Sequence, residues 1–348
     1  MDNREDQPEP DLQPGRVTIR HVAAKAGVSF KTVSRVLNKE PGVRAKVRMA
    51  VEQAAEELKY RPNISARALA GARSYLIGLI YDNPSPNYVS QLQLGAMHAC
   101  REAGHHLMIE QINVNEADLA NRLRDAVGAP RLDGVILSPP LSDSEEVMQA
   151  LEDIGVPYVR IAPDVGHSDR APSIVMDDRR AAIEMTAYLW DQGHRDIGFV
   201  AAPRSHAAAT HRLEGFLHAI GERGGTVRPG YVVEGAFTTA SGVDAGLELL
   251  SHPIRPTAIF AANDEMAAGV MIAAYQNGLA LPGELSVVGF DDSPVARALH
   301  PLLTTVRQPT VEMAQAAARM LIQRENRPER KALDYELIIR GSAAAANT

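Results

Sequence analysis

The segment that decides the fold of the N-terminal region spans residues 17–38 and reads VTIRHVAAKAGVSFKTVSRVLN. Thr18 can cap a first short helix, because hydroxyl side chains are favoured at the N-cap position. Gly27 can then adopt the left-handed conformation that ends a helix, and Ser29 can cap a second helix that runs to Leu37. Two short helices joined by a tight turn that contains glycine predict a helix-turn-helix.

The second of these helices is amphipathic, with valine and leucine on one face and polar or basic side chains on the other. Arginine and lysine suit the acceptor atoms of guanine, hydroxyl groups suit phosphate oxygens, and an aromatic ring can contact a thymine methyl group. A small three-helix bundle that binds nothing would share this pattern, so the spacing alone leaves both interpretations open. The residues that we expect at a DNA duplex are Thr18, Ser29, Phe30, Lys31, Thr32, Ser34, Arg35 and Asn38.

The charge of the chain is distributed unevenly between its N-terminal region and the rest. The whole chain has a net charge of −7, but residues 16–73 hold 13 Lys and Arg against four Glu, a net charge of +9. A compact basic module on an acidic body is the pattern expected when only the module meets phosphates. A solvated basic surface without a partner is the alternative.

Residues 62–63, Pro-Asn, end the basic module and begin another element. Asn63 is a good N-cap for a short helix over 64–70, but isolated helices of fewer than about 12 residues are marginal in water. This segment is therefore predicted either to fold only against a partner or to pack as a linker helix on the body of the protein.

The remainder of the chain alternates apolar runs of strand length with amphipathic helical stretches. Strands that are apolar on both faces and separated by helices predict parallel sheets in a doubly wound α/β arrangement. Their number fits two lobes better than one large sheet. The runs cover residues 76–81, 107–111, 134–137, 158–161, 174–176, 197–201, 258–262 and 285–290.

The chain resembles the lac-repressor (LacI/GalR) family of transcriptional regulators. The resemblance rests on the 17–38 segment, on ELKYRPN (57–63) and ARALAG (66–71), and on several stretches of the body. It implies a helix-turn-helix head, a hinge helix and a two-lobed sensor domain like a periplasmic binding protein. The body stretches are GHRDI (193–197), HRLEGF (211–216), ANDEMA (262–267), SVVGFDD (286–292) and LTTV (303–306).

The resemblance also implies that the hinge helix folds when two copies meet on a pseudo-palindromic operator. Asn63, Ala66 and Leu69 would then lie at the DNA, with Leu69 wedged into the minor groove. One departure is Val-Arg-Ala-Lys-Val-Arg at 43–48, where relatives typically have hydroxyl residues. Phosphate contacts around Arg44 and Val47 are therefore carried over only weakly.

Several of the residues implied to bind a small effector, among them Asn263 and Asp291, follow predicted strands, where open α/β sheets bind ligands. A forked arginine with carboxylate and amide partners suits a sugar-like polyol. The alternative for each is a strand-end cap or an interlobe hydrogen bond, which we favour for Asp264. The carboxylate expected after the 158–161 run is replaced by Ala162, which puts a galactoside in doubt. The implied effector contacts are Tyr88, Arg212, Phe237, Asn263 and Asp291, with further contacts expected in the 82–88 loop.

These patterns give one expected organisation. The resemblance implies that three crossovers join the two lobes, so each lobe is built from separate segments of the chain. The expected parts are a disordered leader at 1–15, the helix-turn-helix domain at 16–60, the hinge at 61–74, the sensor at 75–342 (one lobe about 75–174 and 308–333, the other about 175–305 and 334–342) and a tail at 343–348.

Other function classes find little support in the sequence. The chain contains no G-x-S-x-G, C-x-x-C, H-E-x-x-H or P-loop motif, so we expect no enzyme, no cofactor and no metal site. His206 and His211 are interpreted as part of a polar loop. A plain solute-binding protein is disfavoured by the basic head and by the absence of an export signal. The lone Cys100 excludes an internal disulfide and fits a reducing cytoplasm. No apolar run approaches the roughly 18–20 residues of a membrane span. The family resemblance implies a homodimer, with a tetramer left open.

Overall fold

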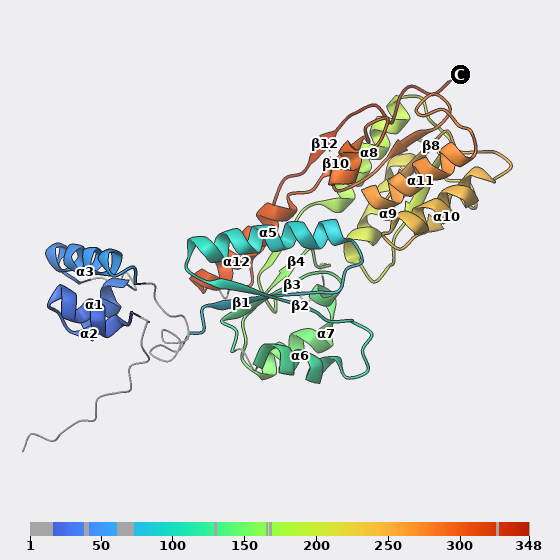
Figure 1. Cartoon of the computed structure of the whole chain (residues 1–348). Coiled ribbons are helices and arrows are strands. Elements are labelled where there is room, and N and C mark those ends of the chain that lie inside the picture. The colour runs from blue at the N-terminus through green and yellow to red at the C-terminus, as the bar shows by residue number, and fades with distance from the viewer. Residues whose placement is uncertain are drawn as a thin grey trace, which may run out of the picture. The chain divides into compact units, whose positions relative to one another are not determined.

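The computed structural model describes residues 17–37, 42–60, 73–128, 131–164, 166, 169–324 and 327–347. The predictions made for the 1–15 leader and for Asn38, Asn63, Ala66 and Leu69 fall outside these residues. The chain divides into two compact units, 1–74 and 75–348 (Figure 1).

The described residues of the first unit form α1 (Ile19–Ala26), α2 (Phe30–Leu37) and α3 (Ala45–Glu57), as expected for a helix-turn-helix head. Gly27 ends α1 in the left-handed conformation, with φ of 65°. The Oγ of Ser29 accepts a hydrogen bond from the amide of Thr32 (3.2 Å) at the start of α2. The predicted turn chemistry is therefore present at both ends of the turn.

The core of the head is small and built from valines. Val22 of α1, Val33 and Val36 of α2 and Val51 of α3 are buried together. At the start of α1 the amide of Thr18 donates to Nδ1 of His21 (3.0 Å). This core fixes α2 with its apolar side inward, so its polar side faces away from the bundle.

The second unit contains two lobes of parallel sheet, each covered by helices on both faces. In lobe 1 the strand order is β11-β5-β4-β3-β1-β2, and all pairs are parallel. Helices α5 and α12 cover one face and α6 and α7 the other (Figure 1). The elements of lobe 1 are β1 (Leu76–Tyr81), α5 (Pro86–Glu102), β2 (His106–Gln111), α6 (Leu119–Gly128), β3 (Gly134–Leu137), η1 (Leu141–Asp143), α7 (Glu145–Asp153), β4 (Tyr158–Ile161), β5 (Ser173–Val175), α12 (Thr310–Gln323) and β11 (Arg330–Ala332).

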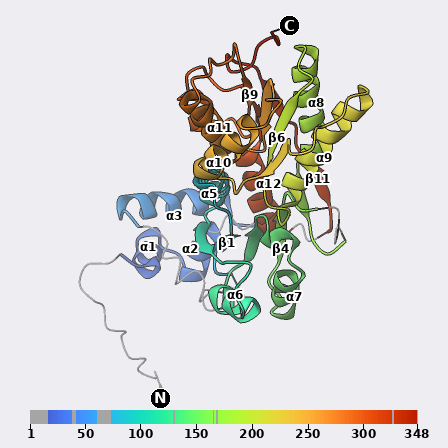
Figure 2. The same cartoon turned by 90° about the vertical axis from the view of Figure 1, so that its right-hand side faces the viewer.

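Lobe 2 has the strand order β7-β6-β8-β9, again parallel, with α8 and α9 on one face and α10 and α11 on the other (Figure 2). An antiparallel pair, β10 with β12, lies beside it. The elements of lobe 2 are α8 (Asp178–Asp191), β6 (Ile197–Ala201), α9 (Ala207–Glu222), β7 (Val232–Glu234), α10 (Thr239–Leu250), β8 (Ala258–Ala261), α11 (Asp264–Gln276), β9 (Ser286–Val288), η2 (Pro294–Arg297), β10 (Thr305–Arg307) and β12 (Glu336–Ile338).

The chain crosses between the lobes three times: between β5 and α8, between β10 and α12, and between β11 and β12. The two-lobed, doubly wound fold expected from the sequence is confirmed. The Ala-rich C-terminus, expected only as a tail, is bound to lobe 2, because the Ala344 carbonyl pairs with Nε2 of His194 (3.0 Å) and the Ala346 amide donates to the Gln192 carbonyl (2.8 Å).

Glycines bring the paired helices of each lobe unusually close. A Cβ on Gly215 of α9 would stand 2.3 Å from the carbonyl oxygen of Arg179 in α8, and a Cβ on Gly95 of α5 would stand 2.0 Å from that of Val311 in α12. Both contacts are with backbone, which cannot move aside as a side-chain tip can. The absence of a side chain is therefore a packing requirement at these positions.

Gly215→Ala is expected to destabilise the protein by about 1–3 kcal/mol, because the two helices must separate to admit the methyl group. Gly221, in the same helix, has no atom near its would-be Cβ. Gly221→Ala is therefore expected to be neutral or to stabilise by up to about 1 kcal/mol through helix propensity. Thermal unfolding of both variants checks the prediction, which fails if the two melting temperatures shift in the same direction.

Candidate functional site

The outward face of α2 carries most of the predicted DNA contacts. Phe30 is 64% exposed, an unusual position for a large ring, and Lys31 is exposed beside it. Ser34 and Arg35 follow one helical turn later and are partly exposed, so the four side chains share one face. The structure thus brings these residues together, next to the half-buried Thr32 and the exposed Ser29 that begin the helix.

The start of α3 is also basic. Arg44 occupies the N-cap without a side-chain cap bond, and the first turn contains no acidic residue. Arg44 and Lys46 are exposed there. Cations at a helix N-terminus oppose the macrodipole and are unfavourable for stability. Together with free backbone amides they are favourable for a phosphate.

A cavity that is partly open to solvent lies between the two lobes, and its empty space, open solvent included, is about 430 Å³. It forms where the carboxyl ends of the strands in both sheets face each other, the usual ligand position in such folds. All five effector contacts implied by the sequence line this one cavity. The lining residues are Asn83, Ser85, Tyr88, Pro139 and Ala162 from lobe 1, His206, Ala208, Arg212, Phe237, Asn263 and Asp291 from lobe 2, and Gln308 from a crossover.

Arg212 is held rigidly at the cavity wall. Its Nε and Nη2 donate to Oδ1 of Asp178 (2.9 and 2.8 Å), and its Nη1 donates to the Ala262 carbonyl (2.7 Å). The guanidinium lies 3.7 Å from the ring centre of Phe290. Since five N–H groups are available to arginine, two remain to reach into the cavity. Asp178 was not predicted, because only the packing of α8 against α9 reveals it.

Asp291 follows β9 with a φ of 127°, a strained value for a residue other than glycine. Gln308 donates to its carboxylate. Burial raises the pKa of Asp291 well above its ordinary value, opposed by Arg212 and reinforced by the nearby Asp264 and Glu265 carboxylates. Asp291 is thus a buried acid, and a ligand that forms a hydrogen bond with its carboxyl group would stabilise it.

Asn263 has a structural role as well as a place in the cavity lining. Its Oδ1 caps α11 by accepting from the amide of Met266 (2.9 Å), and its Nδ2 donates to the Phe237 carbonyl (3.1 Å) and to Glu265 (2.8 Å). Asn263 therefore has the structural role of a cap after β8, which was the alternative to ligand binding. One acceptor site on its amide oxygen is left for a ligand.

Polar contacts between described residues join the lobes around the cavity. Oγ of Ser85 donates to Glu265 (3.4 Å), and Nε2 of His211 lies 3.3 Å from Oδ1 of Asp164. Asp264, by contrast, is structural, as expected: it accepts from the amide of Ser293 (2.7 Å) and from Oγ1 of Thr305 (2.6 Å).

Asp292 anchors a cluster of arginines in lobe 2 and does not line the cavity. Arg297, Arg307 and Arg340 all pair with its carboxylate. Although burial raises the pKa of this carboxyl, hydrogen bonds from the three guanidinium groups lower it to about 2, below the ordinary value of 3.8. Asp292 is therefore ionised at neutral pH and structural.

Asp292→Asn is expected to destabilise the protein at neutral pH by about 3 kcal/mol, because three cations lose their shared partner. A carboxyl whose folded pKa is lowered stabilises the protein above its unfolded pKa, and this contribution is lost as the pH falls from about 4 to about 2. Urea unfolding should therefore separate the variant from wild type clearly at pH 6 and less at pH 3. An equal separation at both pH values would contradict this role.

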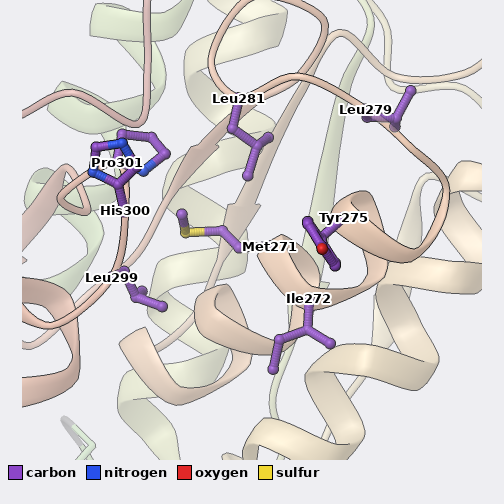
Figure 3. A pocket seen from close by; sticks show the side chains of 8 residues that line it. All are labelled: Met271, Ile272, Tyr275, Leu279, Leu281, Leu299, His300 and Pro301. Carbon is purple, nitrogen blue, oxygen red and sulfur yellow. The ribbon is translucent and has the colours of Figure 1, made fainter.

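A second concavity, whose empty space is about 740 Å³ with open solvent included, lies on the surface of lobe 2 and is largely apolar (Figure 3). Met271, Ile272 and Tyr275 of α11 form one side of it, facing residues 299–301. Tyr275 is 83% exposed, which is unfavourable for a large ring unless a partner covers it.

The described residues contain no group of three or more His, Cys, Asp and Glu side chains placed to hold a metal ion. No helix in the same part of the chain has the length and apolarity to cross a membrane.

A helix-turn-helix head followed by a two-lobed domain with a polar cavity defines a ligand-responsive transcriptional regulator. The sequence profile of bacterial regulatory proteins of the lacI family matches residues 18–63, and that of the periplasmic binding protein-like domain matches residues 186–343. The chain belongs to the lacI family of bacterial regulatory proteins.

Individual relatives agree with this assignment over nearly their whole length. The ribose operon repressor of Escherichia coli K12 is 35% identical over 94% of this chain and 99% of its own, and catabolite control protein A of Priestia megaterium is 34% identical over 89% and 93%. The structure is similar to the lac repressor dimer bound to operator and the anti-inducer ONPF (TM-score 0.78, 29% identity, 95% of this chain and 100% of that one). It is also similar to the CelR–cellobiose complex (TM-score 0.72, 31% identity, 94% and 100%).

Proposed function

We propose that this protein is a cytoplasmic, homodimeric repressor of carbohydrate genes that binds a pseudo-palindromic operator. Its affinity for the operator falls or rises when a sugar-like effector binds in the cavity. The observation that carries the proposal is the combination of an exposed polar face on α2 with a buried polar cavity between two lobes. An enzyme or a plain solute-binding protein would need only the second feature.

The head supports DNA binding through both shape and charge. In a helix-turn-helix the second helix enters the major groove and its exposed side chains meet base edges. On α2 these would be Phe30, Lys31 and Arg35, while Ser29, Thr32 and Ser34 suit phosphate oxygens. The basic start of α3 adds phosphate contacts at Arg44 and Lys46. Asn63, Ala66 and Leu69 remain proposed contacts of the hinge.

The cavity supports a polyol effector. Arg212 offers paired donors, Asp291 and Asn263 offer acceptors, and Phe237 and Tyr88 supply aromatic surface, the mixture that sugars require. Relatives of this chain include a ribose operon repressor and the regulator GalR of Escherichia coli K12, and a similar structure contains cellobiose. Since the carboxylate expected after β4 is Ala162, the sugar need not be a galactoside.

A second copy of the chain is the proposed occupant of the apolar concavity beside α11, since the lac repressor structure similar to this one is a dimer. Tyr275→Asp is expected to weaken dimerisation tenfold or more, because a charge would be buried in an apolar contact. Leu217→Asp, on the exposed side of α9 across the sheet, serves as the control. Sedimentation at micromolar protein concentration measures the mass of the species that wild type and each variant form. The proposal is contradicted if Tyr275→Asp and Leu217→Asp both have the same mass as wild type.

The proposed function is tested by titrating fluorescent DNA from the region upstream of the protein's own gene. We expect sequence-specific binding whose affinity falls steeply, by about 1,000-fold or more, between 50 and 200 mM salt. A thermal-shift screen of sugars should identify the effector, since a ligand at 100 times its Kd stabilises a protein by about 2.7 kcal/mol. A protein that ignores every promoter fragment at low salt is not a repressor.

A further inference from the structure

His206 lines the effector cavity at a position that the sequence did not single out for binding. It follows β6 and is the N-cap residue of α9, yet its side chain makes no cap hydrogen bond. Histidine is not among the favoured capping residues, and elsewhere in lobe 2 Asp177, Thr238 and Asn263 cap their helices with side-chain oxygens. The imidazole of His206 is therefore free to serve another purpose than helix capping.

The ring is buried, fixed and left with one unused polar atom. His206 is 7% exposed, its ring packs edge-on against Phe237 with centres 4.9 Å apart, and Nδ1 lies 3.3 Å from Oγ of Ser205. Nε2 is buried and has no hydrogen-bond partner. A buried polar atom without a partner is unfavourable, so its presence beside a cavity indicates a ligand that completes the pair.

The charges around the cavity indicate what that ligand is. Among the described lining residues Arg212 is the formal cation, and Asp178 neutralises it. Burial, with a smaller contribution from Arg212 opposed by Asp82, lowers the pKa of His206 to about 4, so its ring is neutral at physiological pH. Asp291 lines the same cavity. A phosphate or carboxylate placed here would meet no unpaired cation and would lie near an acid, at a high desolvation cost.

We propose that His206 is a specificity-determining effector contact, whose Nε2 pairs with a hydroxyl group of an uncharged sugar and whose site rejects phosphorylated or acidic sugars. Either tautomer serves, because a hydroxyl group both donates and accepts. The inference rests on the proposed function, since it concerns the ligand of the same cavity.

The test measures sugar binding by calorimetry for wild type, His206→Leu, His206→Gln and the control His218→Leu, because His218 lies on the same helix but is exposed. The probes are D-ribose, D-galactose and D-glucose, each beside its phosphorylated form, and D-galacturonate. For the best neutral sugar we expect Kd to rise tenfold or more in His206→Leu, because a ligand hydroxyl loses its partner. His206→Gln should restore binding to within about threefold, and His218→Leu should match wild type.

Charged counterparts should bind wild type at least tenfold more weakly than the neutral sugar, and operator affinity without sugar should be equal in all four proteins. The inference is overturned if His206→Leu binds the neutral sugar as wild type does, or if a phosphorylated or acidic sugar binds more tightly. Failure of the proposed function looks different: wild type then binds no operator, or binds operator but no member of the sugar panel in either form.

Discussion

Arg35→Ala is expected to lower operator affinity about 100-fold or more while leaving effector binding unchanged. Arg35 lies on the outward face of α2 beside Lys31 and Ser34, where a guanidinium can donate two hydrogen bonds to a guanine edge. Each such contact discriminates by about 1–3 kcal/mol, and the proposed homodimer would lose it in both half-sites. DNA titration at fixed salt gives the loss directly.

The effect should be specific to sequence and to position. Binding of Arg35→Ala to unrelated DNA should change little, since phosphate contacts elsewhere in the head remain. Arg255→Ala, which removes an exposed arginine from lobe 2, should bind operator as wild type does. Equal losses for operator and unrelated DNA would show that Arg35 contacts only phosphates, and a lowered melting temperature of the head would show a structural role.

Arg212→Ala is expected to have the converse effect: the effector no longer alters operator binding, and its Kd rises about 100-fold or more. Arg212 is the paired donor at the cavity wall, and charge-assisted hydrogen bonds are about twice as strong as neutral ones. Operator affinity without effector should stay close to that of wild type. Calorimetry and DNA titration on the same preparation measure both quantities.

Removal of Arg212 also leaves Asp178 buried without its partner, which can destabilise lobe 2 by several kcal/mol. Asp291→Asn provides an independent variant, because asparagine keeps the shape of aspartate and tolerates positive φ. It should lose effector affinity in the same direction with an unchanged melting temperature. The modular account is contradicted if Arg35→Ala and Arg212→Ala lose the same activity.

The fold was predictable where the signal was local. Gly27 and Ser29 fixed the turn of the head, and continuous apolar runs marked strands such as β3 and β8, which are buried on both faces. The strands that escaped prediction, β7, β10, β11 and β12, have three residues each and are partly exposed. Short strands at an edge bury too little to leave a periodic pattern.

The lining of the cavity was predictable only in part, from the residues that follow predicted strands. Asn263 and Asp291 lie just after such strands, and the family resemblance added Tyr88, Arg212 and Phe237. Gln308, Asp178 and the role of His206 were missed, since their partners come from segments far away in the sequence. An N-cap histidine that leaves its helix uncapped is the one local signal that could have drawn attention to His206.

The central claim is that one chain couples a metabolite in the cavity to DNA at the head, and a linkage measurement tests it most directly. The Kd of operator is measured with and without saturating effector, and the Kd of effector with and without operator. The account predicts that both change by the same factor, about 5- to 150-fold, because coupling between two sites is reciprocal. An operator Kd that is identical with the cavity empty and saturated would contradict it.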